Sequence, residues 1–413
     1  MWQKFLRPLL LVFTSLRLTV ILLVFSMALV FFGTLDQVNF GIHETQKRYF
    51  QSFLVFWNPL PPESTNPLAR TGLPLPGGYL LGPLLLLNLL AAQFYRFRWS
   101  WQKSGILLIH GGLVLLIVSG FVTGFLGYER QMWIDEGGTK NWAETYMENE
   151  IVLIDKSEEN RDRVYAFDSD HLKGGEIIDD PKLPVTLEIE EYYPNASVRQ
   201  AGPNMRVEPA ATNGAAPRMG LTATPAPETF AQDEFNADTA IVRVYDGDRD
   251  LGTWMVSNLL DDRFPPQTFM ANGRVYEIAL RFKREYYPFS ITLRDFTHDR
   301  YPGTDIPKNF SSDVVVTDPQ AGVERESLIY MNNPLRYGGH TFYQASFANQ
   351  DTSSMLQVVK NPGWTLPYIA VTLVGLGLVV QFGLGFFRPR RRKTATATAA
   401  DNGPQPPSPD AQA

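Results

Sequence analysis

The sequence predicts an integral membrane protein with four transmembrane α-helices and one large, mainly-β domain on the extracytoplasmic side. Three observations lead to this fold class. The chain of 413 residues contains four long apolar stretches. Positively charged residues gather beside these stretches on one side only. The longest segment between them alternates apolar and polar residues, which is the period of a β-strand.

The four apolar stretches are long enough to cross a membrane. A helix needs about 20 mostly apolar residues to span roughly 30 Å of hydrocarbon. Residues 18–35, 77–95, 105–126 and 364–387 meet this requirement. The first three spans make up the membrane region 1–126, together with a short segment, 36–76, that we expect outside the membrane.

The distribution of positive charge predicts how these spans are oriented. Lysine and arginine residues precede the first span, occupy the loop 96–103 and follow the fourth span at 388–393. Cytoplasmic segments carry this excess. We therefore expect a multi-pass protein of the cytoplasmic (inner) membrane with both termini inside and residues 127–363 on the outer face. The tail 388–413 is expected to be basic at first and then disordered.

The segment 127–363 has the pattern of an antiparallel β-domain. Apolar and polar residues alternate in six stretches: 186–193, 239–246, 275–282, 289–296, 311–318 and 355–362. Turn sequences at 246–248 and 272–273 separate some of them. We expect a sandwich or a barrel-like domain, interrupted by a flexible, Ala/Pro/Thr-rich insertion at 201–235.

Composition excludes several kinds of chemistry. The chain has no cysteine, so disulfides, thiolate metal sites and thiol redox reactions are excluded. Its net charge of −6 and the absence of a glycine-rich phosphate loop give no reason to expect nucleic-acid or nucleotide binding. Any site must use histidine, carboxylate, tyrosine or methionine side chains.

Several separated motifs together resemble one family. They are GTLDQVNFGIHETQKRYFQSF (33–53), PGGYLLGPLLLLNLLAAQ (76–93), IHGGLVLLIVSG (109–120), ERQMWIDEGGTKNW (129–142), YPGTDIPKNFSSDVVVTD (301–318) and NNPLRYGGHTFYQASF (332–347). They resemble ResB of the System II route of cytochrome c maturation, over nearly the whole chain apart from the insertion and the tail.

The resemblance implies a function and two partners. A ResB protein acts with the membrane protein CcsA to move haem outward and to present it to apocytochrome c, where thioether bonds form. ResB is expected to contribute a transmembrane histidine to a b-type haem site and an external domain that helps to hold the apocytochrome. This chain lacks the tryptophan-rich segment and the additional spans of CcsA. It therefore resembles the ResB half, a non-catalytic subunit of a holocytochrome c synthase (haem lyase).

His110 is the leading candidate for an axial ligand to the haem iron. It is the only one of five histidines inside a predicted span, where an ionisable residue is costly and needs a partner. The family's IHGGL-like segment supports this role, while a hydrogen bond to a helix carbonyl or a position at the interface is the alternative. Helical spacing places an apolar face beside it, formed by Leu113, Val114, Ile117, Phe121 and Gly124. A separate stripe of Gly105, Gly112 and Ser119 is suited to close packing against a neighbouring helix.

Two further histidines are weaker candidates for haem binding. His43 lies on the segment 36–76, which we expect to be amphipathic and to lie on the membrane surface. His340 lies in a strand close to the fourth span. Arg336 and Tyr337, in the preceding turn, are candidates for contact with a haem propionate or with the apocytochrome. Asn88, a polar residue within the second span, is expected to form a hydrogen bond between helices.

Two other functions remain open at this level. The chain can be a membrane-tethered scaffold that recruits the apocytochrome or stabilises CcsA without binding haem. A sensor or transporter component is a third alternative, which one ionisable residue in four spans does not favour.

Overall fold

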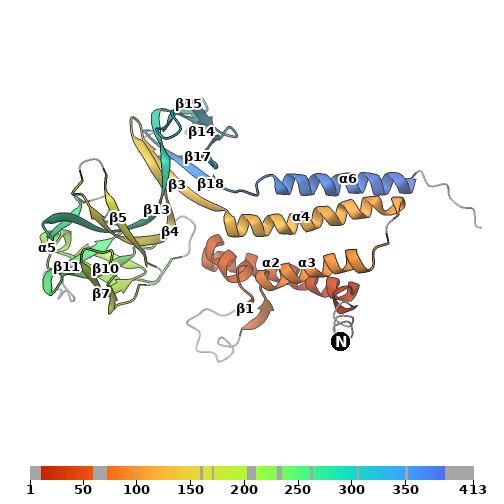
Figure 1. Cartoon of the computed structure of the whole chain (residues 1–413), viewed down its shortest axis with the longest axis horizontal. Coiled ribbons are helices and arrows are strands. Elements are labelled where there is room, and N and C mark those ends of the chain that lie inside the picture. The colour runs from red at the N-terminus through yellow and green to blue at the C-terminus, as the bar shows by residue number, and fades with distance from the viewer. Residues whose placement is uncertain are drawn as a thin grey trace, which may run out of the picture.

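The structure is a computed structural model, described here for residues 11–58, 72–98, 100–158, 161–169, 172–201, 211–229, 235–260, 264–304, 307–348 and 352–386. Within these residues, four helices are long and apolar enough to cross a membrane. They are α2 (Leu16–Thr45), α3 (Gly78–Tyr95), α4 (Ser104–Leu126) and α6 (Leu366–Phe386). The helices lie side by side at one end of the molecule, and the β-domain lies at the other (Figure 1). The predicted combination of four apolar helices and a large mainly-β domain is confirmed.

The first helix is longer than the sequence predicted. Helical structure extends to Thr45 but is broken by a kink at Gly41, whose φ of 64° and ψ of 176° are not helical. A short π-helix, η1 (Gln46–Phe50), follows, and β1 (Leu54–Trp57) then pairs with β2 (Leu73–Pro76). The sequence predicted an amphipathic segment on the membrane surface. In the structure its apolar residues do not share one environment, because Tyr49 is buried against the helices while Phe53 is exposed.

Glycine residues bring α4 and α6 into close contact. The buried residues of α4 are Gly105, Gly112 and Ser119, so the predicted small-residue stripe is confirmed. A Cβ atom on Gly105 would lie 2.6 Å from the Gly377 carbonyl oxygen of α6. Only glycine at this position lets the two backbones approach so closely, and such contacts are the main packing force between helices in a membrane.

Asn88 joins α3 to α2 as expected. Its Nδ2 donates to the Phe13 carbonyl oxygen at 2.6 Å, and its Oδ1 accepts from the Thr19 hydroxyl at 2.7 Å. Both the donor and the acceptor of this buried amide are therefore satisfied within the helix bundle, which removes the cost of placing it in an apolar environment.

The β-domain consists of antiparallel strands. The strands are β3 (Tyr128–Asp135), β4 (Thr139–Asp155), β5 (Arg163–Asp168), β6 (Glu176–Ile178), β7 (Thr186–Tyr193), β8 (Ala196–Gln200), β9 (Leu221–Pro225), β10 (Thr239–Asp246), β11 (Arg249–Ser257), β12 (Gln267–Ala271), β13 (Arg274–Arg300), β14 (Pro307–Asp318), β15 (Val323–Tyr330), β16 (Leu335–Tyr337), β17 (His340–Ala348) and β18 (Ser353–Lys360). All six predicted strand regions are confirmed. The stretches 275–282 and 289–296 belong to the single strand β13 rather than to two strands.

The strands form two lobes instead of one sandwich. In the distal lobe, the sheet β11-β10-β7-β6 packs on the first part of β13, and a core that includes Leu187, Val242 and Ile278 lies between them. In the proximal lobe, β3, β14, β17, β18 and the rest of β13 enclose a second core around Phe289, Val316 and Leu356. The long strands β4 and β13 run through both lobes, and the proximal lobe joins α4 and α6 (Figure 1).

The predicted flexible insertion 201–235 contains regular, packed structure in its described part. Residues 211–229 form the short helix α5 (Ala215–Met219) and β9. Ala211, Ala216 and neighbouring small residues pack on Ile241 and Met255. Alanine contributes little buried area per residue, which explains why composition alone indicated a linker. Residues 202–210 and 230–234 lie outside the described residues, as does the tail after residue 386.

Candidate functional site

His110 lies between α3 and α4 and has a defined hydrogen-bond partner. Its Nδ1 is 3.0 Å from Oε1 of Gln93, a residue of α3. A carbonyl oxygen can only accept, so this contact requires a proton on Nδ1 and leaves a lone pair on Nε2. The described residues provide no hydrogen-bond partner for Nε2. The contact thus orients the ring so that Nε2 is the nitrogen a metal ion can use.

Gln93 was not identified from the sequence, although a signal was present. It is a polar residue in the second apolar stretch, near the same end of the helix pair as His110. Metal-bound histidines usually donate their other ring N–H to an oxygen atom, which fixes the tautomer and the ring orientation. The contact between His110 and Gln93 has this form.

The surroundings of His110 are apolar and open on one side. Leu113 and Gly124 of the predicted face are exposed, and Phe121 is partly buried because it packs over Gly82 of α3. The opposite side of α4 is occupied by α6. A flat apolar ligand that approached His110 would therefore meet aliphatic side chains. These residues fit haem in donor type and polarity, because imidazole is a common axial ligand in cysteine-free sites.

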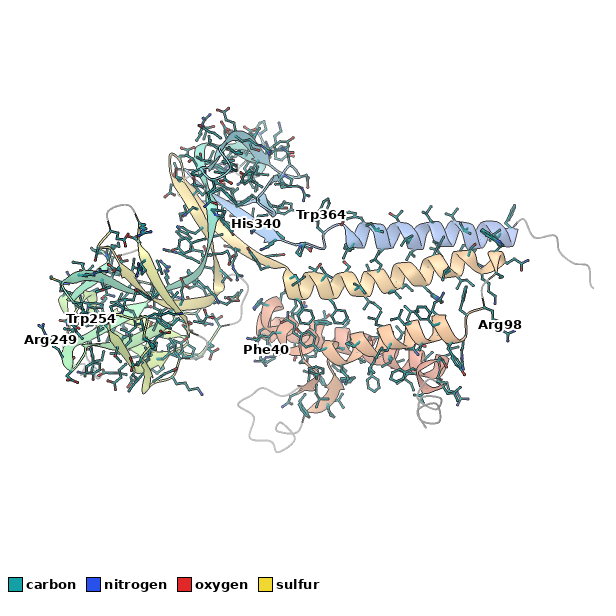
Figure 2. All side chains as sticks on the ribbon, in the orientation of Figure 1. Phe40, Arg98, Arg249, Trp254, His340 and Trp364 are labelled. Atoms are coloured by element: carbon teal, nitrogen blue, oxygen red, sulfur yellow. The ribbon has the colours of Figure 1, made fainter. Side chains whose placement is uncertain are left out.

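His340 lies in a different environment, at the junction between the proximal lobe and the helices (Figure 2). It is buried, with 8% of its surface exposed. Its Nε2 is 2.9 Å from the hydroxyl of Tyr128, which follows α4 directly, and that hydroxyl also lies 3.2 Å from Glu285. The rings of Tyr287 and Phe289 lie 4.8 and 6.4 Å away. In this conformation a haem iron has no access to either nitrogen, because Nδ1 is buried as well.

An irregularity of β13 builds this environment. Tyr286 pairs with Trp142 of β4, whereas the next pair joins Ile291 to Lys140, so that residues 287–290 bulge from the ladder. The bulge directs Tyr287 and Phe289 toward His340. Phe289 also fills the space beside Gly338, where a Cβ atom would lie 2.6 Å from its ring. Bulges of this kind commonly redirect side chains at defined sites.

Burial controls the ionisation of this cluster. It raises the pKa of Tyr128 to about 12, with a further increase from the nearby Glu285 carboxylate. It also lowers the pKa of His340, and the positive charge of Lys360 acts in the same direction. Both groups are therefore neutral at pH 7, and the bond between them joins an uncharged hydroxyl to an uncharged ring.

The remaining sequence candidates are not brought together with His110. His43 is exposed near the C-terminal end of α2. Arg336 stacks its guanidinium over Trp364 at 4.6 Å, directly before α6, and Tyr337 donates a hydrogen bond to Asp318 at 2.9 Å. These contacts give both residues structural roles at the junction between the lobe and the helices.

The architecture thus defines a class: a protein with four apolar helices, an imidazole placed between two of them, and a two-lobed β-domain attached to their ends. Residues 262–355, from shortly before β12 into β18, match the model of the ResB-like family. The chain is also similar to protein NrfI of Wolinella succinogenes, with 38% identity over 92 residues. That match covers 22% of this chain and 10% of NrfI, so the relative is much longer than the region the two proteins share. Residues 262–355 thus match the family that the motifs of the chain predicted.

Proposed function

We propose that this chain is a haem-handling subunit of cytochrome c maturation. Together with a CcsA-like membrane protein, it takes haem across the cytoplasmic membrane and presents it to apocytochrome c for thioether attachment. The match of residues 262–355 to the ResB-like family supports the general role. The specific observation that carries the proposal is the contact between His110 Nδ1 and Gln93, which leaves Nε2 available to iron.

Each residue of the site has a distinct part in this function. His110 binds the haem cargo through Nε2, and Gln93 orients the ring by accepting its Nδ1 proton. Leu113, Ile117 and Phe121 provide an apolar wall that suits a porphyrin plane. The thiols of the thioether bonds would come from the apocytochrome, because this chain has none, and the second axial ligand is expected from the partner.

The proposed topology places His110 near the cytoplasmic end of α4. Both termini are cytoplasmic, and the two-lobed domain lies on the outer face, because positive charges gather before the first span, in the loop 96–103 and after the fourth span. This position suits capture of haem before export. An alkaline phosphatase fusion near residue 228 should be active and a fusion after Lys393 inactive, and the reverse pattern would contradict the orientation.

The haem role is tested by spectroscopy of the purified chain, expressed with and without its CcsA-like partner. The wild-type complex should contain haem with the absorption bands of histidine ligation. His110→Ala should lose most of this haem, and Gln93→Leu should lose part of it because a second-sphere partner typically contributes about 10- to 100-fold in metal affinity. His43→Ala is the control and should retain haem. A wild-type complex that assembles with its partner but never contains haem would favour the scaffold function instead.

A further inference from the structure

The distal lobe contains a sheet edge with a defined set of unpaired backbone groups. β12 and β13 form a hairpin in which Ala271 pairs with Arg274, leaving Asn272 and Gly273 as a two-residue turn. Both turn residues have positive φ angles, 52° and 72°, as in a type I′ turn. The two residues that flank such a turn form both N–H to C=O hydrogen bonds with each other. Along the rest of the hairpin, hydrogen-bonded pairs then alternate with pairs that form no such bonds.

This alternation determines which groups of β12 face outward. Ala271, Phe269 and Gln267 bond to β13, so Thr268 and Met270 direct their N–H and C=O groups away from it. One hydrogen bond on the other side of β13 confirms which residues direct their backbone groups away from the hairpin. The carbonyl oxygen of Val275, which stands opposite Met270, accepts from Lys156 beyond the end of β4, on the far side from β12. Among the described residues, β12 pairs with β13 alone.

A cavity of about 700 Å³ is lined by β12 at these residues. Across it lie β11 and the segment 212–218, and its lining includes Trp254, Phe269, Met270 and Arg218. The two strands do not pair directly. Instead the buried Gln267 side chain bridges them, donating to Met255 O at 2.8 Å and accepting from Ala215 N at 3.0 Å. The Gln267 side chain therefore occupies the place of direct backbone pairing between β11 and β12.

One other edge strand of the domain, β15, is protected in a way that β12 is not. It carries the exposed charged residues Glu324, Arg325 and Glu326 in succession, which is a common means of preventing strand addition. β12 presents Thr268 and Met270 instead. Neither residue is charged, and 67% of the Met270 side chain is exposed.

We propose that the cleft beside β12 binds an extended segment of an unfolded polypeptide, which pairs with the outward backbone groups of Thr268 and Met270. An incoming strand satisfies up to four backbone groups, and one of its apolar side chains enters the space beside Trp254 and Phe269. An unfolded polypeptide has free backbone groups along its whole length, so it can supply such a strand at any accessible segment. The inference rests on the proposed function, because it identifies where apocytochrome c would bind before haem attachment.

A proline substitution tests the backbone pairing. Since the N–H of Met270 points outward, Met270→Pro removes no ladder hydrogen bond and leaves the hairpin paired. Met270→Ala is the matched control, because it removes the same side chain but retains the N–H. Binding of reduced, haem-free cytochrome c to the full chain in detergent should be about tenfold weaker for the proline variant than for the alanine variant. Equal affinity of the two variants would overturn the proposal.

A crosslinking experiment identifies the occupant. The chain has no native cysteine, so a thiol-reactive photo-crosslinker on Met270→Cys reports on this site alone. Ile177→Cys on β6, which replaces a side chain of similar exposure, 62%, is the control. Haem-free cytochrome c should be captured at position 270 and not at 177. Equal capture at both positions, or a crosslink to residues 202–210 of the same chain, would overturn the proposal.

The haem spectrum separates this proposal from the proposed function. If the wild-type chain holds haem through His110 but does not bind the haem-free polypeptide, the cleft proposal fails and the haem role stands. If selective capture occurs at position 270 while the complex never contains haem, the cleft proposal stands and the haem role fails.

Discussion

Adding one methyl group to Gly112 should disturb the helix pair that positions His110. The new Cβ atom would lie 2.7 Å from the carbonyl oxygen of Ala370 and 2.7 Å from a methyl group of Val374. A normal carbon–oxygen contact is longer by roughly half an ångström, and the oxygen belongs to a helix backbone that cannot rotate away. The helices must separate, and we expect Gly112→Ala to lower the free energy of unfolding by about 1–3 kcal/mol.

The adjacent residue provides the control. Gly111 has no atom within 4 Å of the position that a Cβ would take, so Gly111→Ala should be neutral or slightly stabilising. Thermal unfolding in detergent, followed by circular dichroism at the helical band, measures both variants. The haem spectrum of Gly112→Ala should also change, because α4 moves relative to Gln93. Equal melting temperatures for the two variants would refute the packing argument.

Three further predictions concern buried polar groups. Asn88→Leu should destabilise the packing of α3 by about 0.6–2 kcal/mol, measured by thermal unfolding, because the hydrogen bonds to Thr19 of α2 and to the Phe13 carbonyl before α2 are lost. Arg281→Met should lower the free energy of unfolding by about 3–5 kcal/mol, because it leaves the buried Glu150 carboxylate, 3.0 Å from Arg281 Nε, without a partner. A second change, Glu150→Leu, should restore most of the stability, and no recovery would contradict this explanation. His340 has a lowered pKa in the folded chain, so below about pH 6.5 the unfolded chain binds its proton first and stability falls as the pH decreases. His340→Gln should lose less stability than the wild type between pH 7.5 and pH 5.5, and an equal loss would show that burial of His340 does not matter.

The features that the sequence predicted well are those governed by local periodicity. The spans follow from uninterrupted apolar runs, and the stripe of Gly105, Gly112 and Ser119 follows from helical spacing. Strands such as β7 and β10 have the predicted limits because apolar residues alternate along them. In each case one physical rule acts over neighbouring residues, so no tertiary information is needed.

The features that were missed depend on contacts between distant parts of the chain. Gln93 meets His110 only because the short loop folds α3 back against α4. The β13 bulge, which brings Tyr287 to His340, arises from a shift in pairing with β4 that no local pattern encodes. The Ala-rich segment 211–229 is ordered by packing on Ile241, which lies beyond it in the sequence.

The most direct test of haem binding by His110 is an absorption spectrum. It is measured on the purified complex of this chain with its CcsA-like partner, for the wild type and for His110→Ala. The substitution removes one ring from a partly buried site between two helices, so the protein should still insert and fold. The account predicts that His110→Ala loses its haem and that added imidazole restores part of it by occupying the vacant ligand position. If the alanine variant retains full haem with an unchanged spectrum, His110 is a structural residue and the proposed site is wrong.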